Sequence, residues 1–362
     1  MAGLFNPSDI TFSGKEVQAV SELIIEEVYS KPSLSQIHTP VSGIKAKQQI
    51  GYAGRLSGLV GKLSTGCEPT TDTNTIPFTQ KFWEPAYIEG RFVQCFKDLL
   101  PSFWAWALGN GLQKSDLTKT DFVNFVKEIV GDAVYEAWLR LIWFGNTSAA
   151  NYNGSPAGVI TNGISTTYFT PIDGYWEQIA DIVAADSARL SSGLTAKNGQ
   201  ATFALQAFDA TDTTNEIATE TLAQLKYEAD FRLRDKANLM YVVTQSVFDQ
   251  YAKELRSNAN VDASYNRIEG GYTSLMFEGI EVIGVNFFDR MIRAYQSNGT
   301  KYNKPHRALL TTKDMLMVGI EEESNLSEFD IFMDKKTKDM YMDFAFNLDA
   351  KINQDFMIQT SY

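Results

Sequence analysis

The residues that could carry out chemistry in this sequence are few and poorly spaced. It holds two histidines, His38 and His306, and two cysteines, Cys67 and Cys95. No recognised zinc-ligand spacing joins these four residues, and a cysteine–histidine nucleophile pair would require one of each to meet in the fold. Two cysteines also cannot build a disulfide framework, so a reducing compartment is expected. We therefore expect no catalytic residues, no enzyme activity and no cofactor.

Two stretches have a superficial likeness to ligand sites. "GSPAGVITNG" (154–163) is glycine-rich, but it lacks the Gly-Lys-Ser/Thr ending and the G-x-G-x-x-G order, so it is interpreted as a surface loop. The acidic run "IEEES" (320–324), with Asp330 and Asp334, offers oxygen ligands for a divalent cation. A solvated acidic edge is the simpler interpretation, and no metal site is predicted.

Aromatic residues gather in "FWAWALGNGL", from Phe103 to Leu112. Trp104 and Trp106 could form a platform for a sugar ring, which would make this a carbohydrate-binding or hydrolytic protein. Tryptophans also bury large areas in cores and subunit interfaces, and that interpretation is favoured here.

The composition is that of a soluble protein with a large core, with 44% hydrophobic and 21% charged residues among 362. No apolar run approaches the roughly 20 residues of a membrane helix, and the N-terminus lacks a secretory signal pattern. The net charge of −12 argues against sequence-specific recognition of nucleic acid, which needs clustered Lys and Arg. Acidic residues are absent between Glu27 and Glu68, where five basic residues fall. This basic segment is predicted to dock on the acidic surface of another copy.

An extended arm is predicted near the N-terminus. Ser13 and Glu16 have capping-box spacing and open a helix. After it, residues 31–77 lack helical periodicity and carry many glycines, yet they include apolar residues that would be unfavourable in water. The aromatic stretch 78–92 is strand-like again. A long, partly apolar excursion with no core of its own indicates a hairpin arm that is buried against a neighbour.

A long helix and a long strand are predicted farther along the chain. The helix covers about 24 residues from Asp121 to Gly145, roughly 36 Å. The strand is "MYMDFAFNLDAKI" (340–352), whose apolar residues alternate with a strict period of two, and it would reach about 40 Å. Their similar lengths predict that the two elements lie against each other in a thin plate. Residues between them alternate amphipathic helices with short strands, which predicts an inserted α+β domain.

This order of elements resembles the major capsid proteins of tailed bacteriophages, which have the Hong Kong 97-like fold. The most specific local likeness is "WFGNTSAANYNGSPAGVITN", because the family often places a Gly/Asn-rich loop and a Pro-x-Gly-hydrophobic turn after its spine helix. The resemblance implies an α+β fold with an N-terminal arm (1–47), an extended β-hairpin loop (48–95), a peripheral domain with a long spine helix (96–170), an inserted axial domain (171–328) and closing peripheral strands (329–362).

The resemblance also implies roles for particular residues. The extended loop would make inter-subunit contacts through Arg55, Leu56, Leu59, Val60, Lys62 and Leu63. The spine helix would present Phe122, Phe125, Val126, Ile129, Ala133 and Leu141. The turn after it would be formed at Pro156 and Gly158.

The function that follows is assembly into pentamers and hexamers of an icosahedral phage head around double-stranded DNA. The expected location is the virion, after assembly in the cytoplasm of a host bacterium, with no membrane contact. Expected partners are other copies, portal, scaffolding or decoration proteins, and packaged DNA through non-specific contact. Because the chain starts at Met1 shortly before its first helix, scaffolding is expected on a separate protein, if it is needed. The alternatives are an encapsulin-like protein shell and, in a different class, the carbohydrate-binding protein considered above.

Overall fold

The computed structural model describes residues 36–44, 46–53, 78–111, 119–154, 158–257, 266–267, 273–321, 328–333 and 339–362. The helix expected near Ser13 lies outside this part of the chain. Helices and sheets alternate within the described residues, so the predicted α+β class is confirmed. Two larger sheets and one separate two-stranded sheet organise these residues.

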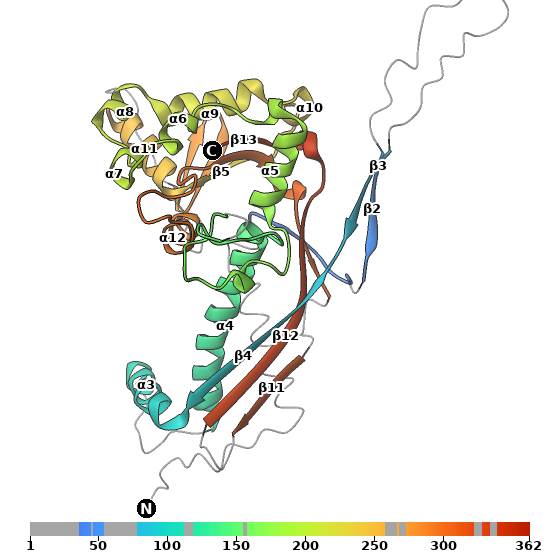
Figure 1. The fold of residues 1–362 in the computed structure, drawn as a ribbon, viewed down its shortest axis with the longest axis vertical. Coiled ribbons are helices and arrows are strands. Elements are labelled where there is room, and N and C mark those ends of the chain that lie inside the picture. Colours follow the sequence, from blue (N-terminus) through green and yellow to red (C-terminus); the bar gives the residue numbers. More distant parts are fainter. Residues whose placement is uncertain are drawn as a thin grey trace, which may run out of the picture.

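The long strand β12 (Asp339–Ile352) organises the first sheet (Figure 1). At 14 residues it extends about 46 Å. Strands β4 (Ala86–Cys95) and β11 (Glu328–Met333) flank its first part, both antiparallel. Its last five residues pair with β10 (Leu316–Ile320), and β1 (Thr39–Val41) adds to β10 in parallel. Strands β11 and β12, which are consecutive in the chain, therefore pair antiparallel within the range expected for the closing strands.

The alternation predicted for β12 holds along most of its length. The even positions Met340, Met342, Phe346, Leu348, Ala350 and Ile352 are buried. Two odd positions depart from it, because Ala345 and Asp349 are buried too. Asp349 lies beside the residues that follow β3, because it accepts a hydrogen bond from the Glu84 N–H.

The predicted spine helix is α4 (Lys119–Phe144), which has 26 residues and a length of about 39 Å. Its buried positions include Phe125, Val134, Trp138, Leu141 and Ile142. Ala133 was expected on this face but is exposed, as is the neighbouring Asp132. The side chains of Phe122, Val126 and Ile129 lie outside the described ones. Gly145 follows the helix where the chain returns, and a Cβ there would approach the carbonyl oxygens of Ile172 and Leu141 to 2.4 and 2.5 Å.

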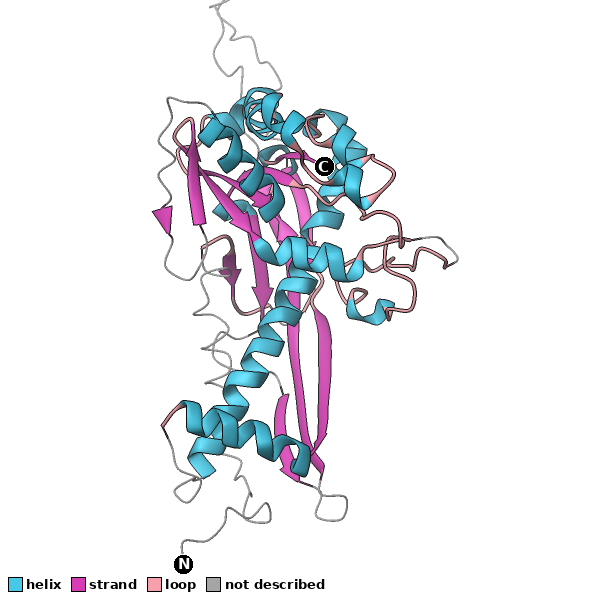
Figure 2. Cartoon of the chain, turned by 90° about the vertical axis from the view of Figure 1, so that its left-hand side faces the viewer, coloured by secondary structure: helices cyan, strands magenta, loops and turns pink. Residues whose placement is uncertain are grey.

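Helix α4 lies against β12, as their matching lengths predicted (Figures 1 and 2). The rings of Trp138 and Phe346 join them, with centroids 5.3 Å apart. The N-terminal end of α4 contacts α3 (Phe96–Gly109) through Phe103 and Phe125, whose rings are 5.4 Å apart. These contacts produce a narrow, elongated half of the molecule.

The second sheet has the strand order β13-β9-β5-β8-β7-β6. Its strands are β5 (Leu239–Thr244), β6 (Asn266–Arg267), β7 (Thr273–Phe277), β8 (Ile280–Val285), β9 (Ala308–Thr312) and β13 (Gln359–Ser361). A tight hairpin turn joins β7 and β8. Glu278 and Gly279 both have positive φ, 46° and 79°, as a type I′ turn requires.

Helices surround this sheet in the broader half of the molecule (Figure 2). They are α5 (Tyr175–Ala185), α6 (Thr195–Asn198), α7 (Phe203–Gln206), α8 (Ala210–Thr214), α9 (Ile217–Glu228), α10 (Phe231–Arg234), α11 (Gln245–Ser257) and α12 (Asn286–Tyr295). An aromatic cluster joins the two halves. The ring of Trp143, near the end of α4, lies 5.0 Å from Tyr175 and 4.6 Å from Phe288, and the buried His38 stacks on Tyr175 at 5.6 Å.

Sheet membership crosses the expected domain boundaries at several strands, including β13, which lies in the range of the closing peripheral strands yet pairs with β9 of the second sheet. Strand β4 falls in the range expected for the extended loop, yet its ten residues pair with β12. Strand β10 falls in the range expected for the axial domain, yet it also pairs with β12. Both strands were assigned from sequence order alone, which does not reveal sheet partners.

Candidate assembly surfaces

A two-stranded hairpin extends away from the rest of the molecule (Figure 1). It consists of β2 (Gln48–Ala53) and β3 (Phe78–Trp83), paired antiparallel from Gln48–Trp83 at the base to Ala53–Phe78 at the far end. Neither strand pairs with the two larger sheets. The sequence predicted this hairpin arm, and the structure confirms its two strands.

The base of this arm is anchored firmly. Trp83 is only 4% exposed and packs on Gly319 of β10, where a Cβ would come within 2.7 Å of the indole ring. The ammonium of Lys81 donates to the carbonyl oxygen of Ile352 at 2.6 Å and pairs with Asp355 at 2.5 Å. These contacts fix the direction in which the arm leaves the body.

A buried carboxylate completes the anchor. Asp349 accepts a hydrogen bond of 2.7 Å from the backbone N–H of Glu84, just after β3. Burial raises the pKa of Asp349, while nearby Lys351 opposes the shift. The side chain of Glu84 pairs with Lys47, and this hydrogen bond lowers the pKa of Glu84. Polar groups just before β2 and just after β3 thus take part in the base of the arm.

The arm also exposes apolar surface at its base. Phe82 is 40% exposed, with the Lys47 ammonium 5.0 Å from its ring centroid. The six predicted contact residues of the arm lie outside the described residues: Arg55, Leu56, Leu59, Val60, Lys62 and Leu63. Their role as inter-subunit contacts therefore stays a prediction.

The outer face of β4 and β12 forms a second candidate surface. Tyr87 and Val93 on β4 are 52% and 48% exposed. Between them, Arg91 makes a bidentate pair with Asp343 on β12, at 2.6 and 2.7 Å. These hydrogen bonds lower the pKa of Asp343. A flat face with exposed aromatic and aliphatic side chains and a fixed ion pair suits contact with another protein surface.

The turn after the spine helix has a packing function at Gly158. A Cβ at this position would lie 2.0 Å from the carbonyl oxygen of Ala150. The Gly158 N–H donates to Asn151 O at 2.9 Å, and the Asn151 amide donates to Thr161 O and Ile164 O, both at 2.9 Å. The loop is therefore closed on itself. Pro156 lies outside the described residues.

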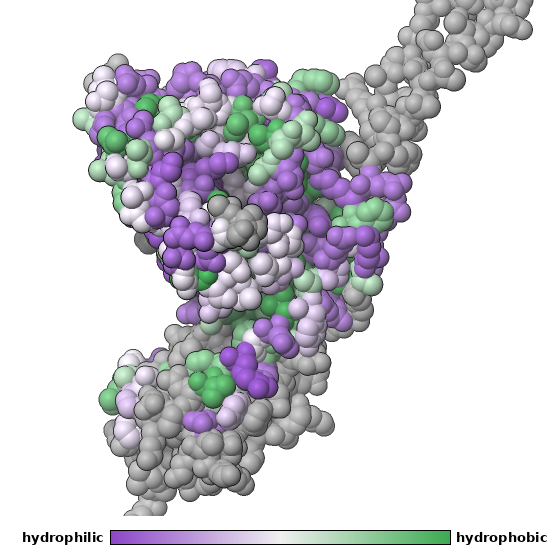
Figure 3. Space-filling model, viewed as in Figure 1, coloured by the Kyte–Doolittle hydropathy of each residue, from purple (hydrophilic) through white to green (hydrophobic). Residues whose placement is uncertain are grey.

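The aromatic stretch that was considered as a sugar platform is at least partly packed in the core. Phe103 is buried, and Trp104 is partly buried against the core, while the side chain of Trp106 lies outside the described ones. Searched over the described residues, the chain shows no cluster of three potential metal ligands and no helix fit to span a membrane. On the face shown in Figure 3, small hydrophobic areas are scattered among hydrophilic ones.

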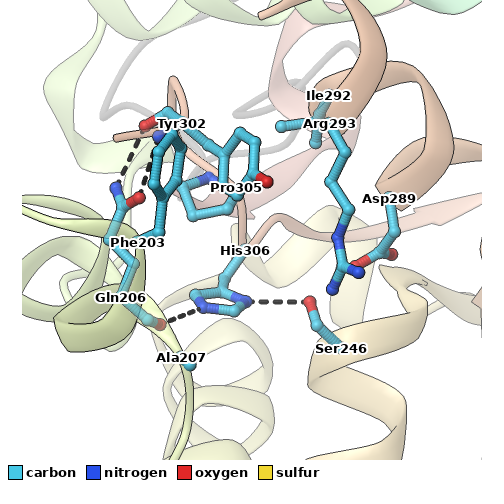
Figure 4. A pocket seen from close by; sticks show the side chains of 10 residues that line it. All are labelled: Phe203, Gln206, Ala207, Ser246, Asp289, Ile292, Arg293, Tyr302, Pro305 and His306. Carbon is cyan, nitrogen blue, oxygen red and sulfur yellow. Dashed lines mark hydrogen bonds between the residues drawn. The ribbon is translucent and has the colours of Figure 1, made fainter. Parts of the chain in front are cut away.

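One polar pair, Ser246 and His306, was not predicted from the sequence. The Ser246 hydroxyl lies 2.8 Å from His306 Nδ1 in a pocket of the second half of the molecule (Figure 4). Sixty positions separate these residues, and no motif spacing joins them, so only the fold reveals the pair.

No protein-family model matches this sequence, and no curated protein matches it. Among solved structures, the chain is similar to a satellite phage P4 procapsid that includes the size determination (Sid) protein, with 12% identity, 96% of each chain covered and a TM-score of 0.47. It is similar to Mycobacterium phage Ogopogo at 10% identity, with 91% of each chain covered and a TM-score of 0.48. It is also similar to a virus-like particle from Pyrococcus furiosus at 8% identity, covering 95% of this chain and 98% of the other, with a TM-score of 0.44.

These proteins come from phage particles and a related shell, and the similarity extends over most of this chain. Because each TM-score is below 0.5, these similarities carry no argument for a function. A function has to be inferred from the architecture of the chain itself.

Proposed function

We propose that this chain is a major capsid protein that self-assembles into pentamers and hexamers of an icosahedral phage head enclosing double-stranded DNA. The observation that carries the proposal is the arm of β2 and β3, which is anchored at its base and pairs with neither larger sheet. An arm held in a fixed direction, with Phe82 exposed, completes its burial when it lies across a neighbouring copy.

The geometry of the contact determines the kind of assembly. An arm that reaches a different surface on the next copy makes a heterologous contact, and such contacts close into rings when the rotation allows it. The elongated half built on α4 and β12 supplies a stiff plate for neighbours to line up on. Many weak contacts of this kind then add through multivalency.

The domain assignment follows the same proposal. The half that contains α4 and β12 is the peripheral domain, and the half that contains the second sheet is the axial domain near the capsomer centre. The tip of the arm, with Arg55 and Lys62, meets carboxylates on the neighbouring copy while its leucines are buried.

Partners and location follow from assembly as well. Portal, scaffolding or decoration proteins would bind the shell, and assembly would take place in the cytoplasm of a host bacterium. Since the net charge is −12, packaged DNA would contact the inner wall weakly and without sequence preference.

The test removes the tip of the arm and keeps its base. Residues 54–77 are replaced by Asn-Gly, which joins Ala53 to Phe78, the last pair of the hairpin, through a two-residue turn. A matched control replaces the same residues by a Gly-Ser linker of equal length. We expect light scattering and negative-stain microscopy to show folded, unassembled subunits for both variants and closed shells for the wild type.

Closed shells of normal size from either variant would contradict the role of the arm. A wild-type protein that stays monomeric would contradict the capsid proposal altogether, and sugar binding by that monomer would favour the carbohydrate-binding alternative. Shells that hold a peptide cargo in place of DNA would identify an encapsulin-like compartment.

A further inference from the structure

The junction of β5 and α11 places a serine against a buried histidine. Strand β5 ends at Thr244, and Ser246 lies in the first turn of the helix that follows. Its hydroxyl is 2.8 Å from His306 Nδ1, whereas the Thr244 hydroxyl is farther away at 3.2 Å. Figure 4 shows the serine and the imidazole facing each other across the pocket.

The hydrogen bonds determine which atoms carry protons. His306 Nε2 lies 2.7 Å from the carbonyl oxygen of Gln206, which can only accept, so Nε2 carries the proton. In the neutral ring Nδ1 is then an acceptor, and the Ser246 hydroxyl donates to it. His306 is only 5% exposed, and burial lowers its pKa to about 4, so the ring is neutral at pH 7. A serine that donates to a neutral imidazole is the arrangement of an activated nucleophile.

Buried side chains around His306 hold it in place. Asn198 binds the backbone of His306 on both sides, accepting from its N–H at 2.9 Å and donating to its carbonyl oxygen at 2.6 Å. The side chain of Gln206 is fixed by Asn198 O and Tyr302 O, each at 3.0 Å. Such orientation by buried neighbours is what a catalytic base requires.

Two adjoining cavities meet at the serine. The smaller has a volume of about 70 Å³ and is lined partly by Phe203, Ile292 and Pro305. The larger, about 660 Å³, lies along α11 and α12. Ser246, Asp289 and Arg293 line both, and Ser246 is partly exposed.

The charges around the larger cavity balance. Asp249 and Asp289 face it together with Arg290 and Arg293, which favours an uncharged substrate over a phosphate or another anion. The Asp289 carboxyl accepts from the Gln245 N–H at 2.6 Å, and burial raises the pKa of this carboxyl. Figure 4 shows Arg293 directed toward Ser246 and Asp289.

We propose that Ser246 is a nucleophile that accepts the acyl group of small, uncharged, activated esters. Its Oγ attacks the ester carbonyl carbon, and the hydroxyl proton passes to His306 Nδ1. The C–O bond to the alcohol then breaks, and the alcohol leaves with that proton. Arg293 stabilises the negative charge on the carbonyl oxygen, and the smaller cavity holds a short acyl chain. Water hydrolyses the acyl-serine in a second step. This activity is separate from assembly and was not predicted from the sequence.

The test uses the full chain, a fluorophosphonate probe and p-nitrophenyl acetate, whose hydrolysis we expect with the wild type and not with Ser246→Ala. The probe forms an Oγ–P bond as fluoride leaves, and peptide mass spectrometry locates the added mass. We expect it at Ser246 in the wild type and in the control Ser187→Ala, which changes an exposed serine elsewhere. In Ser246→Ala we expect no label at this peptide. In His306→Gln we expect labelling to be about 100-fold slower, which is the low end of the rate contribution of a general base.

The pH profile separates catalysis from a structural hydrogen bond. The groups that act on His306 are the Gln206 carbonyl, Lys197, Asp212 and Arg293. We expect the labelling rate to stay constant from pH 8 to about 5 and to fall only near pH 4. Wild-type protein without label at Ser246, or label that appears equally fast in His306→Gln, would overturn the proposal. If His306→Gln does not fold, the location of the label and the pH profile of the wild type test the proposal instead.

Discussion

Replacing Phe346 by alanine tests whether the spine helix and the long strand form one rigid plate. Phe346 is 3% exposed, and its ring lies 5.3 Å from that of Trp138 on α4. Truncating a buried phenylalanine to alanine lowers the free energy of unfolding by about 3–5 kcal/mol. Of this, about 0.5–1.5 kcal/mol belongs to the aromatic pair beyond the area it buries.

Urea unfolding of unassembled subunits, followed by circular dichroism, measures this loss. The expected result is a lower midpoint for Phe346→Ala with an unchanged slope, since the surface exposed on unfolding stays nearly the same. The control is Ala133→Ser on the exposed side of α4, which we expect to stay within about 0.5 kcal/mol of the wild type.

A double-mutant cycle isolates the contact itself. Phe346→Leu and Trp138→Leu are measured singly and together, and a coupling free energy of about 0.5–1.5 kcal/mol is expected. A loss of less than about 1 kcal/mol in the free energy of unfolding of Phe346→Ala would contradict the packing of the strand on the helix, because this is far below the range for a buried phenylalanine. A coupling free energy of zero would show that helix and strand are held together by other contacts.

Three further changes test other parts of the structure. Gly90→Val would place a Cβ 2.3 Å from the Phe344 ring, so we expect a loss of about 1–3 kcal/mol in urea unfolding that Phe344→Leu partly restores. Trp83→Ala removes the anchor on Gly319, so trypsin should cleave after Lys81 faster than in the wild type, and equal rates would contradict the anchor. The lowered pKa of His306, about 4 against 6.5 in the unfolded chain, means that the unfolded state binds more protons between these values. Stability should therefore fall by about 3 kcal/mol as the pH drops from 6.5 to 4, and His306→Gln should lack this part of the loss.

The sequence predicted the elements whose signal is periodic. The alternation of residues 340–352 predicted β12, and the helical stripe of residues 121–145 predicted α4. Both patterns come from burial on one face, which tertiary context reinforces. The turn at Glu278 and Gly279 was also predictable, because glycine permits the positive φ that its second position needs.

Other features depend on neighbours that are distant in the sequence. Nothing local marks Trp83 as the partner of Gly319 or Lys81 as the partner of Asp355. Ala133 was expected on the buried stripe because alanine suits either face of a helix, and only the packing decides. The pair of Ser246 and His306 arises because β5 and β9 are adjacent strands, which no spacing in the chain reveals.

Asp349 shows how a departure from the strand pattern serves the arm. Alternation places it on the solvated face of β12, yet it is buried where it accepts the hydrogen bond from Glu84. A buried carboxylate is favourable only when its oxygens are bonded, so the backbone after β3 must return to the same place each time the chain folds. The ammonium of Lys81 adds a second contact, because it donates to the carbonyl oxygen of Ile352 at the end of the same strand and to the carboxylate of Asp355 shortly after it. The strand that stiffens the plate therefore also sets the direction of the arm, and in the proposed shell this one rigid element would link the body of each copy to its contact with the next.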